Sequence, residues 1–190
     1  MRELLPQAYL LGLIGLLTVA AVAVGRQILR VRRDEAALAR LGGNDGPGGR
    51  PSDAAGLYEL GSVQLRKRLY GQAGDTLRQA LRLAQAEPAP SEALALIENA
   101  LGFALAAQGR YPAAVRHYRA ALKARSEYPV AMNNLAFALE KQQKPDEARK
   151  LYEQVLALES GNGTARKRLR LLERRSVSGL PDAGGDDRAA

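Results

Sequence analysis

The sequence of 190 residues predicts an all-α fold, in which three stacked helical hairpins and a capping helix follow a single apolar helix at the N-terminus. Three observations predict it. An uncharged apolar stretch begins near the N-terminus, a pattern of leucine and alanine recurs along the body of the chain, and β-branched runs are scarce outside residues 18–24. The chain is also rich in Ala, Leu, Arg and Gln, which all favour helices.

The first element is an apolar stretch over residues 8–25, which carries no charge. Together with Leu4 and Leu5 it is long enough to cross a hydrocarbon core of ~30 Å, so residues 1–25 are predicted to be a transmembrane anchor. An alternative is a cleaved signal peptide, in which the small residues at 21–23 would form the cleavage site.

A basic helix is predicted directly after the anchor, over residues 26–41. It carries four arginines next to the apolar stretch, which oppose translocation and predict that the rest of the chain lies on the cytoplasmic side. These membrane-proximal residues are Arg26, Arg30, Arg32 and Arg33.

Two segments without an apolar pattern frame the body of the protein. Residues 42–53 contain five glycines and two prolines, which is typical of a flexible linker. Residues 176–190 lack apolar periodicity, and we expect a disordered tail there. The body therefore runs over residues 54–175.

The body contains three similar stretches that align on Leu60, Leu101 and Leu135. Each leucine is followed at once by a small residue, thirteen positions later by alanine, and four positions further by a large side chain. These positions are Gly61, Gly102 and Ala136, then Ala73, Ala114 and Ala148, then Leu77, Tyr118 and Tyr152. The spacing of the last two leucines equals the period of the tetratricopeptide repeat, a helix–turn–helix unit of about 34 residues.

The first spacing is seven residues longer than the second, and we expect the extra residues to form a longer loop at 86–92, where two prolines occur. Gln64 departs from the repeat, because the pattern prefers an apolar residue there. Residues 164–175 are predicted to be a helix that caps the last repeat.

Gly102 lies inside a predicted helix, where glycine costs about 1 kcal/mol relative to alanine. The repeat supplies a physical reason. Small residues let the two helices of one unit approach closely, and the large residues fill the remaining space. We therefore expect a larger side chain at Gly102 to be blocked by packing.

The first helices of the repeats are expected to line a concave groove that binds a protein client. Phe103 and Phe137 are separated by one repeat period and would act as apolar anchors, while Asn99 and Asn133 would bond a peptide backbone. The alternative is that both phenylalanines are partly buried packing residues. The full set of groove candidates is Tyr58, Ser62, Leu65, Asn99, Phe103, Ala106, Asn133, Phe137 and Glu140.

Composition excludes several kinds of site. The chain has no cysteine and a single histidine, His117, which excludes a disulfide framework, a cysteine nucleophile and a metal cluster of cysteines or histidines. We find no catalytic constellation, and we expect no enzyme activity, no metal and no cofactor. His117 is interpreted as a surface histidine.

The net charge of +8 suits anionic partners. The basic run at 166–175 would suit phosphates or anionic lipid headgroups, although a solvated cap face is the alternative. No set of base-stacking aromatics accompanies the charge, so nucleic acid is not predicted. Some tetratricopeptide domains clamp chaperone carboxylates with Lys, Asn and Arg. The corresponding positions here do not match, so we do not expect a heat-shock chaperone client; they include Tyr58, Ser62, Ala100 and Val130.

The order of these segments resembles one family. The anchor "LLPQAYLLGLIGLL" leads into "RQILRVRR", and the repeats contain "YELGSVQLRKRLYGQA", "NALGFALAAQGRY" and "AMNNLAFALEKQQKPDEA". Over residues 1–175 the chain is similar to the membrane-anchored tetratricopeptide proteins of cyanobacteria and chloroplasts that assist photosystem I assembly, the family of hypothetical chloroplast reading frame 37.

The resemblance implies a non-catalytic scaffold that assists assembly or stability of photosystem I. It implies a single-pass protein of the thylakoid membrane, with the repeat domain on the cytoplasmic (stromal) side. The partners would be photosystem I subunits or other assembly factors. Two alternatives stay open: a general membrane-anchored adaptor or co-chaperone for another bacterial membrane complex, and a periplasmic repeat protein released from a signal peptide.

Overall fold

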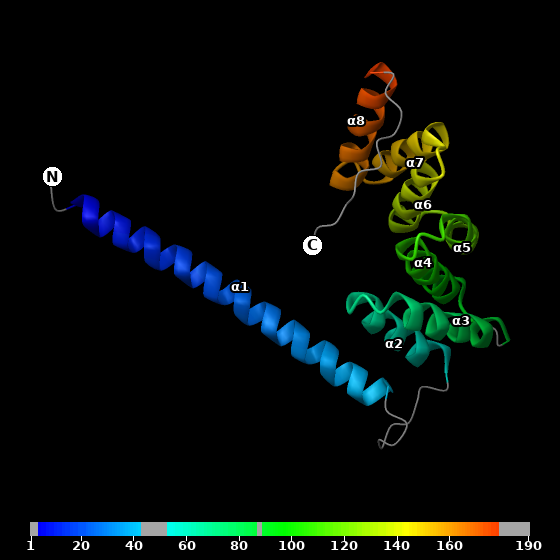
Figure 1. Ribbon diagram of the computed structural model, residues 1–190, viewed down its shortest axis with the longest axis horizontal. Coiled ribbons are helices and arrows are strands. Elements are labelled where there is room, and N and C mark those ends of the chain that lie inside the picture. The colour runs from blue at the N-terminus through cyan, green and yellow to red at the C-terminus, as the bar shows by residue number, and fades with distance from the viewer. Residues whose placement is uncertain (1–3, 43–52, 87–88, 179–190) are drawn as a thin grey trace. The chain divides into compact units, whose positions relative to one another are not determined.

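The computed structural model describes residues 4–42, 53–86 and 89–178, and every regular element in these residues is an α-helix (Figure 1). The chain divides into two units, Met1–Pro51 and Ser52–Ala190, which we describe separately. The first unit contains one long helix and the second contains a stack of shorter ones.

The first unit is built on α1, a continuous helix over Leu4–Gly42. Within its portion Gly12–Ala36, the most apolar window of 18 residues has a mean hydropathy of 1.8, so the helix is long and apolar enough to cross a membrane. The hydroxyl of Thr18 donates a hydrogen bond to the backbone oxygen of Ile14 at 2.8 Å, which satisfies the polar group inside the helix. The expected anchor and the expected basic helix are thus parts of one helix. Residues 43–52 of the expected linker lie outside the described residues.

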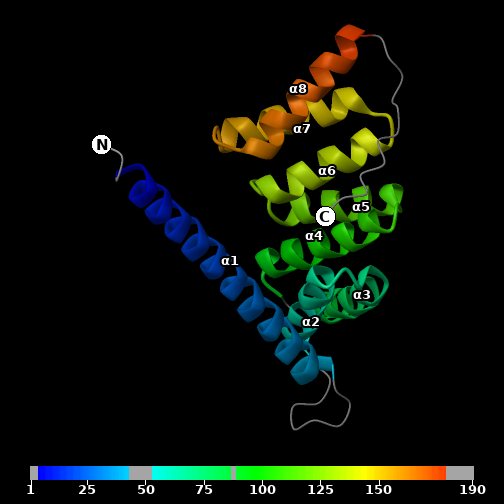
Figure 2. The same cartoon turned by 60° about the vertical axis from the view of Figure 1, so that its left-hand side comes forward.

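The second unit is a succession of seven helices, and the described residues contain no strand. Consecutive helices lie side by side in both views (Figures 1 and 2). The hairpins are α2/α3, α4/α5 and α6/α7, and α8 packs on the last of them. This arrangement confirms the predicted fold class. The helices are α2 (Ala54–Arg66), α3 (Tyr70–Ala86), α4 (Ser91–Ala107), α5 (Tyr111–Ala124), α6 (Pro129–Lys141), α7 (Pro145–Leu158) and α8 (Gly163–Ser178).

Local sequence signals set the ends of these helices. The side chain of Asp53 accepts a hydrogen bond from the backbone N–H of Gly56 at 3.2 Å and caps α2. Proline occupies one of the first positions of α5, α6 and α7, where its missing N–H costs nothing.

The turn inside each hairpin contains one residue with a left-handed backbone, eight positions after the aligned leucine. The φ angles are 60° at Arg68, 76° at Gly109 and 60° at Gln143. Glycine adopts this conformation without the steric conflict of a Cβ atom, so the middle turn is the least strained of the three.

The interfaces inside the hairpins explain the glycines of the repeat. A Cβ atom added at Gly61 would lie 2.7 Å from Cγ of Leu77, and one added at Gly102 would lie 2.7 Å from Cε1 of Tyr118. Leu77 and Tyr118 are at most 1% exposed, so neither has space to withdraw. The predicted close approach of the two helices is therefore confirmed in the first two units.

The seven extra residues of the first spacing do not form a longer loop, so that prediction is wrong. They lengthen two helices, since α3 and α4 each have 17 residues whereas α5 has 14 and α6 has 13. The connection from Ala86 to Ser91 is as short as the one from Ala124 to Pro129. The physical reason is that the added turns carry apolar side chains: Ala84 is buried, and Leu94 packs against the same cluster.

The last helix continues the repeat instead of merely covering it. Leu169 follows Leu135 by one repeat period, and it is buried with Ala165 and Leu172 in the core shared with the preceding helices. The side chain of Asn162 accepts a hydrogen bond from the backbone N–H of Ala165 at 3.0 Å and caps the helix. The helix extends to Ser178, three residues beyond the expected end of the body, and residues 179–190 lie outside the described residues.

Candidate functional site

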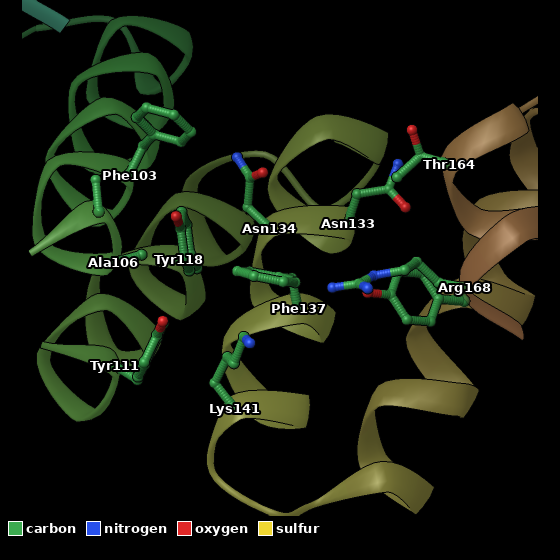
Figure 3. Close-up of a pocket in the computed structure, with 12 residues that line it drawn as sticks. Phe103, Ala106, Tyr111, Tyr118, Asn133, Asn134, Phe137, Lys141, Thr164 and Arg168 are labelled. Carbon is green, nitrogen blue, oxygen red and sulfur yellow. The ribbon is translucent and has the colours of Figure 1, made fainter. Parts of the chain in front are cut away.

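A pocket of about 670 Å³ opens on the face formed by α4, α6 and α8 (Figure 3). Phe103 comes from α4, Phe137 from α6 and Arg168 from α8, so residues far apart in sequence are brought to one place. We call this surface the groove pocket. Its other lining residues are Ala106, Ala107, Tyr111, Tyr118, Asn133, Asn134, Lys141, Tyr152 and Thr164.

The two phenylalanines lie at the surface of the groove pocket. Phe103 is 43% exposed and meets the ring of Tyr70 edge to face, with 6.5 Å between the ring centroids. Phe137 is also partly exposed, and two basic side chains contact its ring. A partner molecule could therefore reach both aromatic rings.

Two cations lie over the ring of Phe137. The guanidinium carbon of Arg168 is 4.6 Å from the ring centroid, and the ammonium nitrogen of Lys141 is 5.5 Å from it. Both distances are within the range of a cation–π interaction. This contact holds the two basic side chains at the same end of the pocket.

Glu140 forms an ion pair with one of these cations, Arg168. Its Oε1 atom accepts a hydrogen bond from the hydroxyl of Tyr152 at 2.7 Å and lies 3.4 Å from Nε of Arg168. Burial, the hydrogen bond to Glu140 and the charge of Glu140 all raise the pKa of Tyr152 above its usual value. The phenol therefore stays protonated and donates to the carboxylate.

The asparagines form two separate hydrogen-bond groups. Asn99 accepts a hydrogen bond from the Nδ2 of Asn134 at 3.0 Å and donates one to the hydroxyl of Tyr128 at 3.3 Å. Asn133 donates to the side-chain oxygen of Asn162 at 3.3 Å, while its own side-chain oxygen is buried and has no hydrogen-bond partner among the described residues. The side chain of Asn99 is therefore engaged in hydrogen bonds within the protein.

The groove pocket collects four of the nine residues predicted for the groove, namely Phe103, Ala106, Asn133 and Phe137. Asn99 and Glu140 instead belong to the networks behind it. The other three predicted residues lie on α2. Tyr58 lines a separate apolar hollow of about 270 Å³ between α2 and α4, Leu65 packs against the core, and Ser62 is half-buried.

Several residues that line the groove pocket were not predicted from the sequence. They are Tyr111, Asn134, Lys141, Thr164 and Arg168. Two of them carry a signal in the sequence, because Arg168 follows Asn134 by one repeat period and Lys141 lies four positions after Phe137 on the same helix.

The described residues contain no group of three or more His, Cys, Asp or Glu side chains that could hold a metal ion. The Nδ1 atom of His117 lies 2.7 Å from Oε2 of Glu98, and the two side chains are 26% and 11% exposed. The histidine therefore links α5 to α4 and does not line the groove pocket.

Two tetratricopeptide-repeat family models match the chain, one over residues 52–127 and the other over residues 105–170. The chain is 30% identical over 177 residues to the uncharacterized protein ycf37 of Guillardia theta, a match that covers 93% of this chain and 97% of that protein. It is 34% identical over 161 residues to the tetratricopeptide repeat domain-containing protein PYG7, chloroplastic, of Arabidopsis thaliana. That match covers 85% of this chain and 52% of the relative, so the chain spans about half of PYG7.

Solved structures share the fold. The first tetratricopeptide-repeat domain of Spaghetti (RPAP3), solved with an HSP90 peptide SRMEEVD, superposes with a TM-score of 0.59 at 23% identity. The match covers 70% of this chain and 99% of that domain. Stacked repeats of this kind are protein-interaction scaffolds and generally not enzymes.

Proposed function

Because the chain belongs to the ycf37 family of tetratricopeptide-repeat proteins, we propose that it is a non-catalytic, membrane-tethered scaffold that assists assembly or stability of photosystem I in the thylakoid membrane. The family relationship and the resemblance to photosystem I assembly proteins support the choice of client. A chloroplast protein of Arabidopsis thaliana among the relatives supports the compartment.

The groove pocket is the observation that carries the binding function. It offers about 670 Å³ beside two partly exposed phenylalanines, Phe103 and Phe137. Grooves lined by apolar anchors and a few polar groups recognise helices and extended segments of other proteins. We propose that a segment of the client lies in this groove.

The first unit supplies the tether in this proposal. α1 is long and apolar enough to span a membrane, and the arginines that follow its apolar stretch favour a cytoplasmic or stromal repeat domain. A tether raises the effective concentration of the groove near membrane clients, so a modest intrinsic affinity would be sufficient.

The test is an affinity pull-down with the full tagged chain from detergent-solubilised thylakoid membranes, with the captured proteins identified by mass spectrometry. We expect photosystem I subunits to be enriched by the native chain and lost when Phe103→Ser and Phe137→Ser are combined. The matched control combines Leu83→Ser and Leu158→Ser, since these side chains are 38% and 43% exposed but do not line the pocket.

Two outcomes would change the proposal. Enrichment of a different membrane complex, with no photosystem I above background, would remove photosystem I as the client and favour a general membrane-anchored adaptor. If the phenylalanine variant captures as much of the photosystem I subunits as its control does, the groove pocket is not the surface that binds them.

A further inference from the structure

We propose that the groove pocket takes an acidic protein segment, whose carboxylates lie against Lys141 and Arg168 while an apolar side chain packs beside Phe103 and Phe137 (Figure 3). The inference rests on the proposed scaffold function, because it names the chemistry of the client segment that the groove binds.

The charged residues that line the pocket are all positive. Of its twelve lining residues only Lys141 and Arg168 are charged, both are cations, and no carboxylate lines the pocket. Both cations contact the same ring, that of Phe137, so their charges are concentrated at one end. Attraction between opposite charges strengthens where low-dielectric walls displace water, as they do in a pocket.

Arg168 is oriented for a ligand that accepts hydrogen bonds. Glu140 lies 3.4 Å from its Nε atom and is itself fixed by the hydroxyl of Tyr152. This contact involves the Nε atom, and a guanidinium carries further N–H donors on its terminal nitrogens, whose planar arrangement suits a carboxylate. In Figure 3 the guanidinium reaches across the pocket toward Phe137.

Lys141 supplies the charge that the protein itself leaves unmatched. The carboxylate of Glu140 balances Arg168, whereas Lys141 is exposed and its one interaction among the described residues is with the ring of Phe137. The ammonium group thus contributes a net positive charge at the rim of the pocket. An acidic residue of the partner would complete the balance.

A protein segment fits this surface better than a lipid headgroup does. The cations lie beside a surface that also presents Phe103, Ala106 and Tyr111, so the pocket offers contacts for an apolar side chain as well as for a charge. A peptide provides both kinds of group along one extended or helical segment.

The experiment probes the full chain in detergent micelles against an array of short overlapping peptides from the stromal segments of photosystem I subunits. The array also carries one designed peptide in three forms, with its leucine and phenylalanine anchors set among Asp and Glu, among Asn and Gln, or among Lys and Arg. Each spot is measured with the native chain, with Lys141→Gln, and with Lys150→Gln, an exposed lysine outside the pocket.

We expect the bound photosystem I peptides to be acidic and to lose binding when their Asp and Glu become Asn and Gln. Lys141→Gln should lower affinity about two- to fivefold, which corresponds to one partly exposed ion pair, and added salt should weaken binding further. Lys150→Gln should leave affinity unchanged. Circular dichroism of the variants confirms that each is folded.

The outcomes separate the two proposals. Binding of neutral or basic peptides without any effect of Lys141→Gln would overturn the acidic-segment inference and leave the scaffold function intact. If no photosystem I peptide binds but the acidic designed peptide does, with the expected effect of Lys141→Gln, the inference stands and the photosystem I client is wrong. Binding to none of the peptides would overturn both.

Discussion

The interfaces inside the hairpins and the groove across them are built from the same helices but follow different rules. At the interfaces the contacts repeat, since an added Cβ would lie 2.7 Å from a buried side chain at both Gly61 and Gly102. Along the groove the residues change from unit to unit. The repeat period therefore identifies the residues that pack the helices together. The residues available to bind a partner occupy positions that this packing does not constrain.

Two hollows of the repeat stack show how far those free positions diverge. The hollow near Tyr58 has about 270 Å³ and is lined by Ala, Leu, Ile, Pro and a tyrosine. The groove pocket has about 670 Å³ and carries Lys141 and Arg168. The same kind of helical unit thus produces an uncharged hollow in one place and a cationic pocket in another.

The largest effect on folding is expected at an interface. Gly102→Leu should lower the free energy of unfolding by about 1–3 kcal/mol, because its first side-chain atom already overlaps the buried ring of Tyr118. Thermal or denaturant unfolding of the full chain in detergent measures the change.

Gly74→Ala is the matched control for this prediction. Gly74 is also buried inside a helix, but an added Cβ would be 3.6 Å from its nearest neighbour, the side chain of Gln108, which is an ordinary contact. Alanine should therefore stabilise the chain by up to about 1 kcal/mol through helix propensity. Similar losses at both glycines would show that the close approach at Gly102 does not set its identity.

Tyr152→Phe sharpens the comparison, because Tyr152 belongs to both regions. Its ring is fully buried in the core, while its hydroxyl supports Glu140 and, through it, Arg168. Loss of one hydrogen bond to a charged group should cost about 1.5 kcal/mol, without creating a cavity. We expect both unfolding and binding of the acidic designed peptide to respond.

A change in stability without any change in peptide affinity would show that Arg168 keeps its position without the hydroxyl. The control is Tyr111→Phe, at a residue that lines the same pocket but is only partly buried. It should leave the unfolding midpoint nearly unchanged, because its phenol is not part of the Glu140 network.

The interfaces could be predicted from the sequence because their signal is local and periodic. Small and large residues recur in a fixed register, and close packing requires that combination. The extra seven residues were harder to place, because prolines at 88 and 90 favour a loop, whereas the apolar Ala84 and Leu94 extend the flanking helices.

The groove pocket could be predicted only in part. The period identified Phe103 and Phe137, but the state of Asn99 depends on Tyr128, a residue of the connection that follows α5. Arg168 lies in a run of basic residues whose charge alone suggests a solvated face. Its role appears only when the repeat period is extended into α8, where Leu169 occupies the position of Leu135.

The smallest effect on stability is expected in the groove. Phe103→Ser removes a side chain that is 43% exposed and makes one edge-to-face contact, with Tyr70. The free energy of unfolding should change by only about 0.5 kcal/mol, in line with other surface substitutions, while client affinity falls by about tenfold or more if the ring is an anchor. Leu158→Ser, at an equally exposed residue outside the pocket, should change neither quantity. If Phe103→Ser instead loses its structure cooperatively, the ring of Phe103 contributes to the fold as the interface residues do. The separation between packing residues and binding residues would then be wrong at Phe103, the residue on which it most depends.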